Sequence, residues 1–256
     1  MAAATGRPHL SIVVPAFDEE QRLRVNLPAI ARYVEEQRLE AEILVVDDGS
    51  RDATARVAES FLAQTRGRVL RVGENRGKGH AVRGGLLAAA ARWVLVTDAD
   101  LSTPIAEHAR LAAAVRDHDL DGAIGSRALP GSRVEVRQAR PRELMGKSFN
   151  LLVRALTGLP FRDTQCGFKL LDRERMRPLV ERMVIERFAF DVELLYLCMR
   201  FGLRVEEIPV VWRNDPRTTV SIVTDAPRML LDVLRVRWRF RRGLYNPAGA
   251  SGVEGG

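Results

Sequence analysis

The sequence predicts an α/β fold in which a mostly parallel sheet is covered by helices on both faces. Short apolar runs alternate along the chain with longer segments whose apolar residues recur at helical spacing. The short runs are apolar throughout, which is typical of parallel strands buried on both faces. Three of them end in acidic residues. Because ligands bind at the carboxyl ends of such strands, we expect the site at this edge of the sheet.

Five strands are expected in the first half of the chain, each from an apolar run. In chain order they cover residues 10–15, 43–46, 69–72, 93–97 and 122–125. Acidic pairs follow the first, second and fourth strands: Asp18 with Glu19, Asp47 with Asp48, and Asp98 with Asp100. Three acidic strand ends that converge at one edge are hard to explain as turns, and they favour a binding site.

Helices are expected between these strands, each opened by a short polar residue that can accept a hydrogen bond from the first turn. The expected caps are Asp18 (with Gln21 at capping-box spacing), Ser50 and, just before Pro104, Thr103. A glycine-rich loop, residues 73–79, precedes a helix expected over residues 81–92.

The second half is expected to contain further helices, one last strand and a basic C-terminal helix. Residues 133–142 are rich in arginine and should be exposed and face an anion. Helices are expected over 144–156 and 188–201, an irregular then extended segment over 161–171, and the last strand over 204–212.

One long helix is expected from Asp225 to Arg242. It carries six arginines and two aspartates, which give +4 of the chain's net charge of +7. Apolar and aromatic residues lie between them, a composition that suits the membrane–water interface. A helix docked on the core with a solvated basic face is the alternative. The expected division is a main domain over 1–220, a membrane-interface helix over 221–245 and a disordered tail over 246–256.

Length and composition are those of a soluble globular protein, with 256 residues, 46% hydrophobic and 29% charged. The two cysteines make no disulfide framework, so a reducing compartment is expected. Residues 1–8 lack the apolar core of a signal peptide, and no run reaches the ~18 apolar residues of a membrane span. We therefore expect a cytoplasmic protein. Acidic strand ends would repel the phosphates of nucleic acid, so nucleic acid is not the expected partner of the basic charge.

Asp98 and Asp100 are the strongest candidates for chemistry. In an extended chain, side chains two residues apart point to the same side. Two adjacent carboxylates repel each other unless a cation lies between them. Mg²⁺ or Mn²⁺ is the simplest candidate, since hard cations take oxygen ligands. A plain turn is the alternative for this pair taken alone.

Seven motifs occur in an order that is specific in combination. They are VPAFDE (14–19), VDDGS (46–50), NRGKG (75–79), TDADLS (97–102), GSR (125–127), DTQCGFK (163–169) and FAFDVELL (188–195). On these motifs the chain resembles the family 2 inverting glycosyltransferases of the GT-A fold, whose sheet is Rossmann-like, over residues 10–245. It is most similar to the dolichyl- and polyprenyl-phosphate sugar synthases, and above all to the dolichyl-phosphate β-glucosyltransferase branch.

The resemblance implies a nucleotide-sugar site with a divalent metal. Residues implied to hold the base and ribose are Pro15, Phe17, Glu19 and Asp48. Lys78 would lie near the base or phosphates, with a solvated loop lysine as the alternative. Asp98 and Asp100 would hold Mg²⁺ or Mn²⁺ across the nucleotide diphosphate, with Ala99 against the nucleotide.

The resemblance also implies the diphosphate and acceptor contacts. Arg127 and Arg142 match arginines that contact the acceptor phosphate, a role that suits the planar guanidinium fork. Arg213 matches an arginine on the diphosphate side. The family's lysine six residues later falls at Thr219, so that positive charge is missing, and Arg217 is the candidate substitute.

Three residues of the later motifs, Asp163, Gln165 and Lys169, are implied to shape the sugar and acceptor pocket. Asp191 is a candidate general base or sugar ligand, with helix capping as the alternative. A lipid monophosphate has a second pKa of about 6, so it is already a nucleophile at pH 7 and needs positioning more than a base. Among the histidines, we interpret His80, His108 and His118 as structural.

These implications define an expected function. The chain should transfer a hexose, glucose from UDP-glucose, to a polyprenyl or dolichyl phosphate, as a peripheral protein on the cytosolic, inner face of a membrane. GDP-mannose or a UDP-N-acetylhexosamine is the alternative donor. A separate membrane-protein partner is a further hypothesis. A nucleotide-binding protein without transfer is the alternative of another class. A nucleotidyltransferase is disfavoured, because such enzymes place a glycine-rich loop directly after the first strand.

Overall fold

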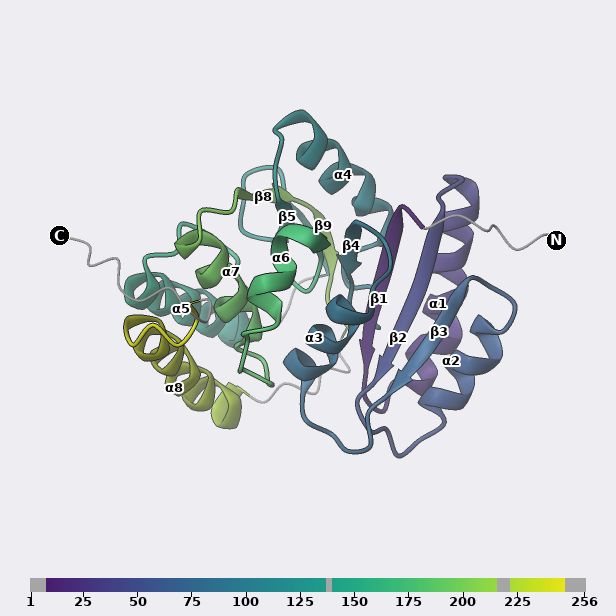
Figure 1. The fold of residues 1–256 in the computed structure, drawn as a ribbon, viewed down its shortest axis with the longest axis horizontal. Helices are drawn as coiled ribbons and strands as arrows, with labels where there is room; N and C mark the ends of the chain where they lie inside the picture. Colours follow the sequence, from purple (N-terminus) through teal and green to yellow (C-terminus); the bar gives the residue numbers. More distant parts are fainter. Residues whose placement is uncertain (1–7, 137–139, 216–221, 247–256) are drawn as a thin grey trace.

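The computed structural model describes residues 8–136, 140–215 and 222–246, with the backbone alone for 140–142 and 222–225. Its main sheet has seven strands in the order β3-β2-β1-β4-β7-β5-β8 (Figure 1). Their bounds are β1 Leu10–Ala16, β2 Ala41–Asp47, β3 Gly67–Arg71, β4 Trp93–Val96, β5 Gly122–Ser126, β7 Lys169–Asp172 and β8 Val205–Pro209. A second, two-stranded sheet pairs β6 (Arg133–Val136) with β9 (Val211–Arg213).

The main sheet is mostly parallel, as the continuous apolar runs predict. β1 pairs in parallel with both β2 and β4, and β5 pairs in parallel with β8. Among the strands that the structure describes, β7 alone runs against its neighbours. The direction of the strand order reverses between β1 and β4, and at such a switch point an α/β sheet forms a crevice for ligands.

Helices cover both faces of the sheet (Figure 1). Their bounds are α1 Glu20–Glu36, α2 Thr54–Leu62, α3 Lys78–Ala88, α4 His108–Asp117, α5 Arg140–Thr157, α6 Arg173–Val180, α7 Phe190–Arg200 and α8 Ile222–Arg241. A short 3-10 turn, Ile105–Glu107, precedes α4.

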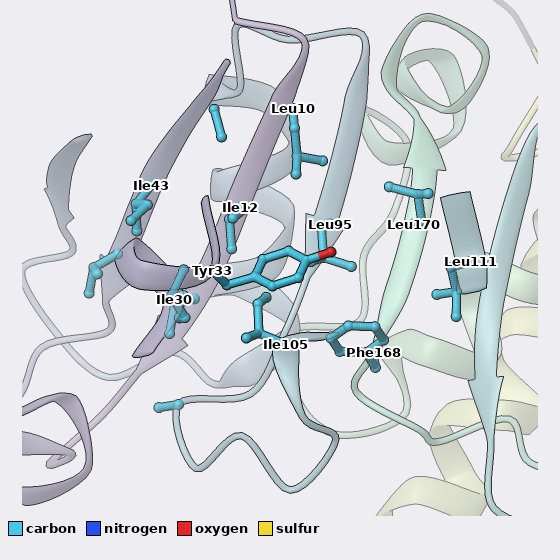
Figure 2. Close-up of a cluster of buried hydrophobic side chains, with 14 of the residues drawn as sticks. Leu10, Ile12, Ile30, Tyr33, Ile43, Leu95, Ile105, Leu111, Phe168 and Leu170 are labelled. Atoms are coloured by element: carbon cyan, nitrogen blue, oxygen red, sulfur yellow. The ribbon is translucent and has the colours of Figure 1, made fainter. Parts of the chain in front are cut away.

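Alternating residues of the buried strands supply two separate cores, one on each face. Ile12 packs in a cluster with residues of α1, α2 and α4. Its neighbour Val13 packs in a second cluster with residues of α3, α6 and α7. Figure 2 shows the first cluster, where Ile12 and Leu95 from adjacent strands lie beside Ile30 and Tyr33 of α1. This alternation explains why consecutive strand residues, such as Ile12 and Val13, are apolar.

The predicted helix caps are wrong. α1 begins at Glu20 and α2 at Thr54, and neither has a side-chain cap. Instead, the two loops are joined to each other. The Asp18 N–H donates to Ser50 Oγ at 2.9 Å, and the Arg51 N–H donates to Asp18 Oδ1 at 2.7 Å. Tertiary contacts between neighbouring strand ends therefore use the side chains that local spacing assigned to caps.

Other boundaries also differ from the prediction. Thr103 does not cap a helix, because Pro104 opens the 3-10 turn and α4 starts only at His108. The strand expected over 204–212 is two strands, β8 and β9, in different sheets. Helix α6 was not predicted; it follows β7 directly and is capped by Asp172, which accepts from the N–H groups of Glu174 and Arg175.

None of the described helices is long and apolar enough to cross a bilayer. The basic helix α8 lies against α5 (Figure 1). It buries Met229, Val233 and Val236 at 7%, 0% and 0% exposure, so one face of α8 belongs to the core. Residues 247–256, most of the expected tail, lie outside the described residues.

Candidate active site

The acidic strand ends meet at the switch point, as the sequence predicts. β2, β1 and β4 are adjacent and parallel, so the loops that carry Asp48, Glu19 and Asp98 leave the sheet at the same edge. Glu19 and Asp100 are close enough to influence each other, because the charge of Asp100 helps burial to raise the pKa of Glu19.

The acidic pair after β4 lies in a turn rather than in an extended strand. β4 ends at Val96, and Leu101 has a φ of +48°. The Leu101 N–H donates to the Asp98 carbonyl at 3.1 Å, and the Ser102 N–H donates to Asp100 Oδ1 at 2.8 Å. The expectation that Asp98 and Asp100 lie in an extended strand is therefore wrong, and side-chain alternation does not apply to this pair.

Asp98 is already paired with a lysine. Lys78 Nζ lies 2.6 Å from Asp98 Oδ1, and 24% of the Lys78 side chain and 33% of the Asp98 side chain remain exposed. Burial works against the charge of Lys78, but Asp98, Asp191 and Asp100 outweigh it and raise the pKa of the lysine. Lys78 is therefore part of the site rather than a solvated loop lysine.

Three cations act on the Asp98 carboxylate. Burial would raise its pKa, but the charges of Lys78, Lys169 and Arg127 outweigh burial and hold the pKa below its usual value. Burial and the neighbouring Asp98 raise the pKa of Asp100. The two carboxylates are therefore different: Asp98 is a neutralised anion, whereas Asp100 is an anion with little local compensation.

Gly167 fixes how closely the segment before β7 approaches this turn. A Cβ at Gly167 would lie 2.1 Å from Asp98 Oδ2, a distance that no side chain tolerates. The glycine of the DTQCGFK motif is thus needed for the backbone to pass directly over the Asp98 carboxylate.

The cations of two ion pairs act on the Asp98 carboxylate, and the first of these pairs is buried. Lys169 Nζ is 2.5 Å from Asp191 Oδ1 and also donates to the Cys166 carbonyl; Lys169 and Asp191 are 1% and 3% exposed. Burial raises the pKa of Asp191, although Lys169 and Lys78 oppose it.

Arg127 forms the second of these pairs, with Asp163. Arg127 donates from its backbone N–H, Nε and Nη2 to Asp163 at 2.9, 2.7 and 2.8 Å. Its guanidinium also lies over the Trp212 ring, 5.2 Å from the centroid. Burial would raise the pKa of Asp163, but Arg127 outweighs it and lowers that pKa.

Asp48 holds the glycine-rich loop. Its Oδ2 accepts from the N–H groups of Arg76 and Gly77 at 3.1 and 2.6 Å, and Gly77 has a φ of +118°. Asp48 Oδ1 and His80 Nδ1 lie 3.6 Å apart, and both are buried atoms without a hydrogen-bond partner in the described part of the chain. Buried polar atoms of this kind are uncommon in proteins, and here the two atoms face each other.

Two side chains of α1 reach the site and were not predicted from the sequence. Arg22 donates to both oxygens of Glu19 at 2.7 and 2.8 Å, and Asn26 Nδ2 donates to the Ala99 carbonyl at 2.7 Å. They are four residues apart and therefore lie on one face of the helix. The available signal was a polar pair at helical spacing beside the apolar stripe of Leu23 and Leu27.

The remaining predicted residues lie in varied surroundings. Pro15 is buried on β1, and Phe17 is partly exposed just after it. Gln165 lies in the loop before β7, and Arg213 is exposed and paired with Glu135 at 2.6 Å. Arg142 lies on α5, but its side chain is outside the described residues, as are Arg217 and Thr219 entirely. His108 is structural, as predicted: it is 8% exposed and lies 3.0 Å from the Tyr33 hydroxyl.

Comparison with known proteins identifies a family. A family model described as glycosyl transferase family 2 matches residues 11–177. The dolichyl-phosphate beta-glucosyltransferase of Dictyostelium discoideum is 32% identical over 249 residues, which are 93% of this chain and 76% of that protein. The human protein of the same name is 33% identical over 249 residues, 92% of this chain and 77% of that protein.

Solved structures share the fold at lower identity. Glucosyl-3-phosphoglycerate synthase from Mycobacterium tuberculosis in complex with UDP is similar with a TM-score of 0.68 and 20% identity, over 90% of this chain and 80% of that chain. The same enzyme in complex with Mn²⁺ and UDP-glucose has a TM-score of 0.64 at 20% identity, over 91% of this chain and 79% of that chain.

Proposed function

The chain belongs to glycosyl transferase family 2 and is a glycosyltransferase of the GT-A fold, and we propose its donor, acceptor and place of action from this premise. We propose that it transfers glucose from UDP-glucose, with inversion, to a dolichyl or polyprenyl monophosphate at the cytosolic face of a membrane. The proposed acceptor is inferred from sequence identity: the chain is 32% and 33% identical to two dolichyl-phosphate beta-glucosyltransferases, over 93% and 92% of its length.

The nucleoside would bind between the ends of β1 and β2. Asp48 supports this assignment, because its buried Oδ1 has no hydrogen-bond partner among the described residues and would accept from a base N–H or a ribose hydroxyl. Glu19 would accept from the ribose from the other side, with Pro15 and Phe17 supplying apolar contact. These roles are those that the sequence motifs predict.

The diphosphate would bind at the turn after β4. Asp98 and Asp100 offer the hard oxygen ligands that suit Mg²⁺ or Mn²⁺. No group of three or more His, Cys, Asp or Glu side chains forms a metal cage in the described part of the chain. The diphosphate oxygens would therefore complete the coordination, which is how Mg²⁺ is commonly held. When bound, the metal supplies charge stabilisation to the leaving diphosphate. Lys78, whose ammonium lies 2.6 Å from Asp98 Oδ1, would share this carboxylate with the metal and place a positive charge beside the diphosphate.

The acceptor phosphate would attack the anomeric carbon from the face opposite the diphosphate. The new bond joins a phosphate oxygen to that carbon, and the bond from the carbon to the diphosphate oxygen breaks, so UDP leaves with the electron pair. Arg127 is 31% exposed along its side chain and fixed by Asp163, so it is positioned to meet this phosphate. Arg142 and Arg213 are proposed for the acceptor and the diphosphate, respectively.

No general base is required in this scheme. The acceptor has a second pKa of about 6 and is already a nucleophile at pH 7. Asp191 is 3% exposed and paired with Lys169. This burial and pairing support a positioning role for Asp191 rather than proton transfer.

The membrane would contact the outer faces of α5 and α8. Large apolar side chains are exposed there on both helices: Leu144 67%, Leu151 66%, Leu231 66%, Leu234 44% and Trp238 54%. Leu144 with Leu151, and Leu231 with Trp238, are seven residues apart, so each pair lies on one helix face. Exposed arginines lie among them on α8, at positions 228, 235 and 241, and Arg242 follows directly after the helix. Apolar side chains beside cations suit an anionic membrane surface. A membrane-protein partner on this surface is the alternative.

The test is a transfer assay with purified protein, Mg²⁺ or Mn²⁺, polyprenyl phosphate and radiolabelled UDP-glucose, GDP-mannose and UDP-N-acetylglucosamine. We expect label to enter the lipid phase from UDP-glucose, and an Asp100→Ala variant to lose this transfer. Transfer from another donor would change the assigned sugar. UDP binding without transfer to the lipid would reject the lipid acceptor and favour a soluble acceptor or a nucleotide-binding role.

A further inference from the structure

An ion cluster at the donor side of the site contains two residues, Arg22 and Asp215, that have no role in the scheme above. Together with Glu19 they form what we call the Arg22 bridge. Arg22 Nη1 donates to both Glu19 oxygens at 2.7 and 2.8 Å, and Arg22 Nε donates to Asp215 Oδ2 at 3.0 Å. The side chains of Arg22, Glu19 and Asp215 are 9%, 17% and 12% exposed.

The bridge joins parts of the chain that are distant in sequence. Glu19 lies between β1 and α1, Arg22 lies in the first turn of α1, and Asp215 lies two residues after β9, 193 positions from Arg22. The end of β9 itself is also fixed, because the Arg213 N–H donates to the Ser102 carbonyl at 2.7 Å. Ser102 in turn donates its N–H to Asp100. The β9 segment, residues 213–215, is thus linked through Arg22 to Glu19 and through Ser102 to the turn that carries Asp100.

Arg22 balances the charge of two carboxylates. Its guanidinium contacts both Glu19 and Asp215, and the three side chains are at most 17% exposed. Without Arg22, both carboxylates would keep their negative charge with little solvent to screen it, on the side of the site where the anionic donor is proposed to bind.

The shape of arginine suits this position. One guanidinium meets a carboxylate on each of two edges in fixed directions, whereas a lysine ammonium is a point charge without this fork. The contact to both Glu19 oxygens fixes the direction of that carboxylate. A second arginine on the same helix, Arg24, pairs with Glu20 at 2.8 Å but is 55% exposed. Arg24 therefore provides a matched comparison for charge without burial.

We propose that Arg22 is a positioning residue for donor binding: it orients Glu19 for the nucleoside and, through Asp215, holds the β9 segment against the Asp100 turn. This inference rests on the proposed function, since it names the structural support of the same donor site. It predicts that loss of Arg22 weakens nucleotide binding while the protein remains folded.

The experiment measures UDP affinity by calorimetry, in the presence of Mn²⁺, for the wild type and four variants. Arg22→Met and Asp215→Asn should each weaken UDP binding by about tenfold, the factor that corresponds to roughly 1.4 kcal/mol. Arg22→Lys should restore part of the affinity, because it keeps the charge but lacks the fork. Arg24→Met should bind UDP like the wild type. In the transfer assay, Arg22→Met should raise the KM for the donor more than the KM for the lipid.

A double substitution separates coupling from general destabilisation. If Arg22 and Asp215 act through one contact, Arg22→Met with Asp215→Asn should weaken UDP binding less than the product of the two single effects. Circular dichroism would verify folding. If Arg22→Met does not fold, the single variants Asp215→Asn and Arg22→Lys still test the proposal.

Two results would overturn the assignment. A folded Arg22→Met variant that binds UDP within a factor of two of the wild type would reject the Arg22 bridge and leave the proposed function intact. A wild type that binds neither UDP nor GDP would reject both.

Discussion

Replacing Lys169 with methionine should destabilise the protein in a way that depends on pH. Lys169 and Asp191 are 1% and 3% exposed, with 2.5 Å between Nζ and Oδ1. Methionine is close to lysine in length and would leave the Asp191 carboxylate buried without its nearest cation. Removing one partner of a buried pair costs about 3–5 kcal/mol of unfolding free energy. We expect the lower end, roughly 3 kcal/mol, because Lys78 also acts on Asp191.

The sign of the pH effect follows from Asp191. Burial already raises its pKa against the opposing charge of Lys169, and loss of Lys169 removes that opposition and raises the pKa further. A carboxyl whose pKa is higher in the folded state than in the unfolded state lowers stability above the unfolded pKa, and this loss is regained as pH falls through the folded pKa. The difference in stability between wild type and Lys169→Met should therefore be larger at pH 7 than at pH 5.

Urea denaturation of the wild type and two variants at both pH values measures this effect. In the double variant Lys169→Met with Asp191→Leu, no carboxylate remains buried, so it should be more stable than Lys169→Met alone at pH 7. A cost below about 1 kcal/mol for Lys169→Met, the range of exposed pairs, would refute the reasoning. A double variant no more stable than the single one would refute it as well.

Three further predictions concern other parts of the molecule. Gly167→Ala should lower transfer by about a hundredfold, because its Cβ would displace Asp98, whereas Gly84→Ala, with nothing within 4 Å, should leave transfer unchanged. Burial lowers the pKa of His108 from 6.5 to about 4, so the unfolded chain binds a proton between these values and the folded chain does not. His108 should therefore contribute a loss of about 2 kcal/mol of unfolding free energy between pH 7 and pH 5, so the difference in stability between wild type and His108→Gln in urea denaturation should change by this amount over that range. Trp238→Ala, at a side chain 54% exposed, should reduce flotation with anionic vesicles; unchanged flotation would reject α8 as the membrane contact.

The positions of the central strands were predictable because these strands contain continuous apolar runs, as in residues 12–14 of β1 and 43–46 of β2. Ile12 and Val13 pack in the cores on opposite faces of the sheet, so residues on both faces of β1 are apolar. Helix starts were not predictable from capping residues. Asp18 and Ser50 are 32 positions apart and hydrogen-bond across neighbouring loops, and local spacing contains no information about that contact.

The site residues were predictable only where a motif brings them together along the chain. The TDADLS motif contains both aspartates of the turn, and the glycine-rich loop contains Lys78. Arg22 was missed because its second partner, Asp215, is 193 positions away. The role of Gly167 was also invisible, since it depends on the approach of the segment before β7 to the turn after β4.

The pairing of charges in the site gives a physical reason for a divalent metal. Each of four site cations already faces a carboxylate within 3.0 Å: Lys78 with Asp98, Lys169 with Asp191, Arg127 with Asp163, and Arg22 with Glu19. These pairs fix the geometry, but they leave little uncompensated positive charge for a nucleotide diphosphate. Asp100 adds a negative charge that Asp98 makes less favourable. A divalent cation at Asp100 would balance this carboxylate and the diphosphate together, so nucleotide and metal should bind cooperatively, each strengthening the other by the same factor.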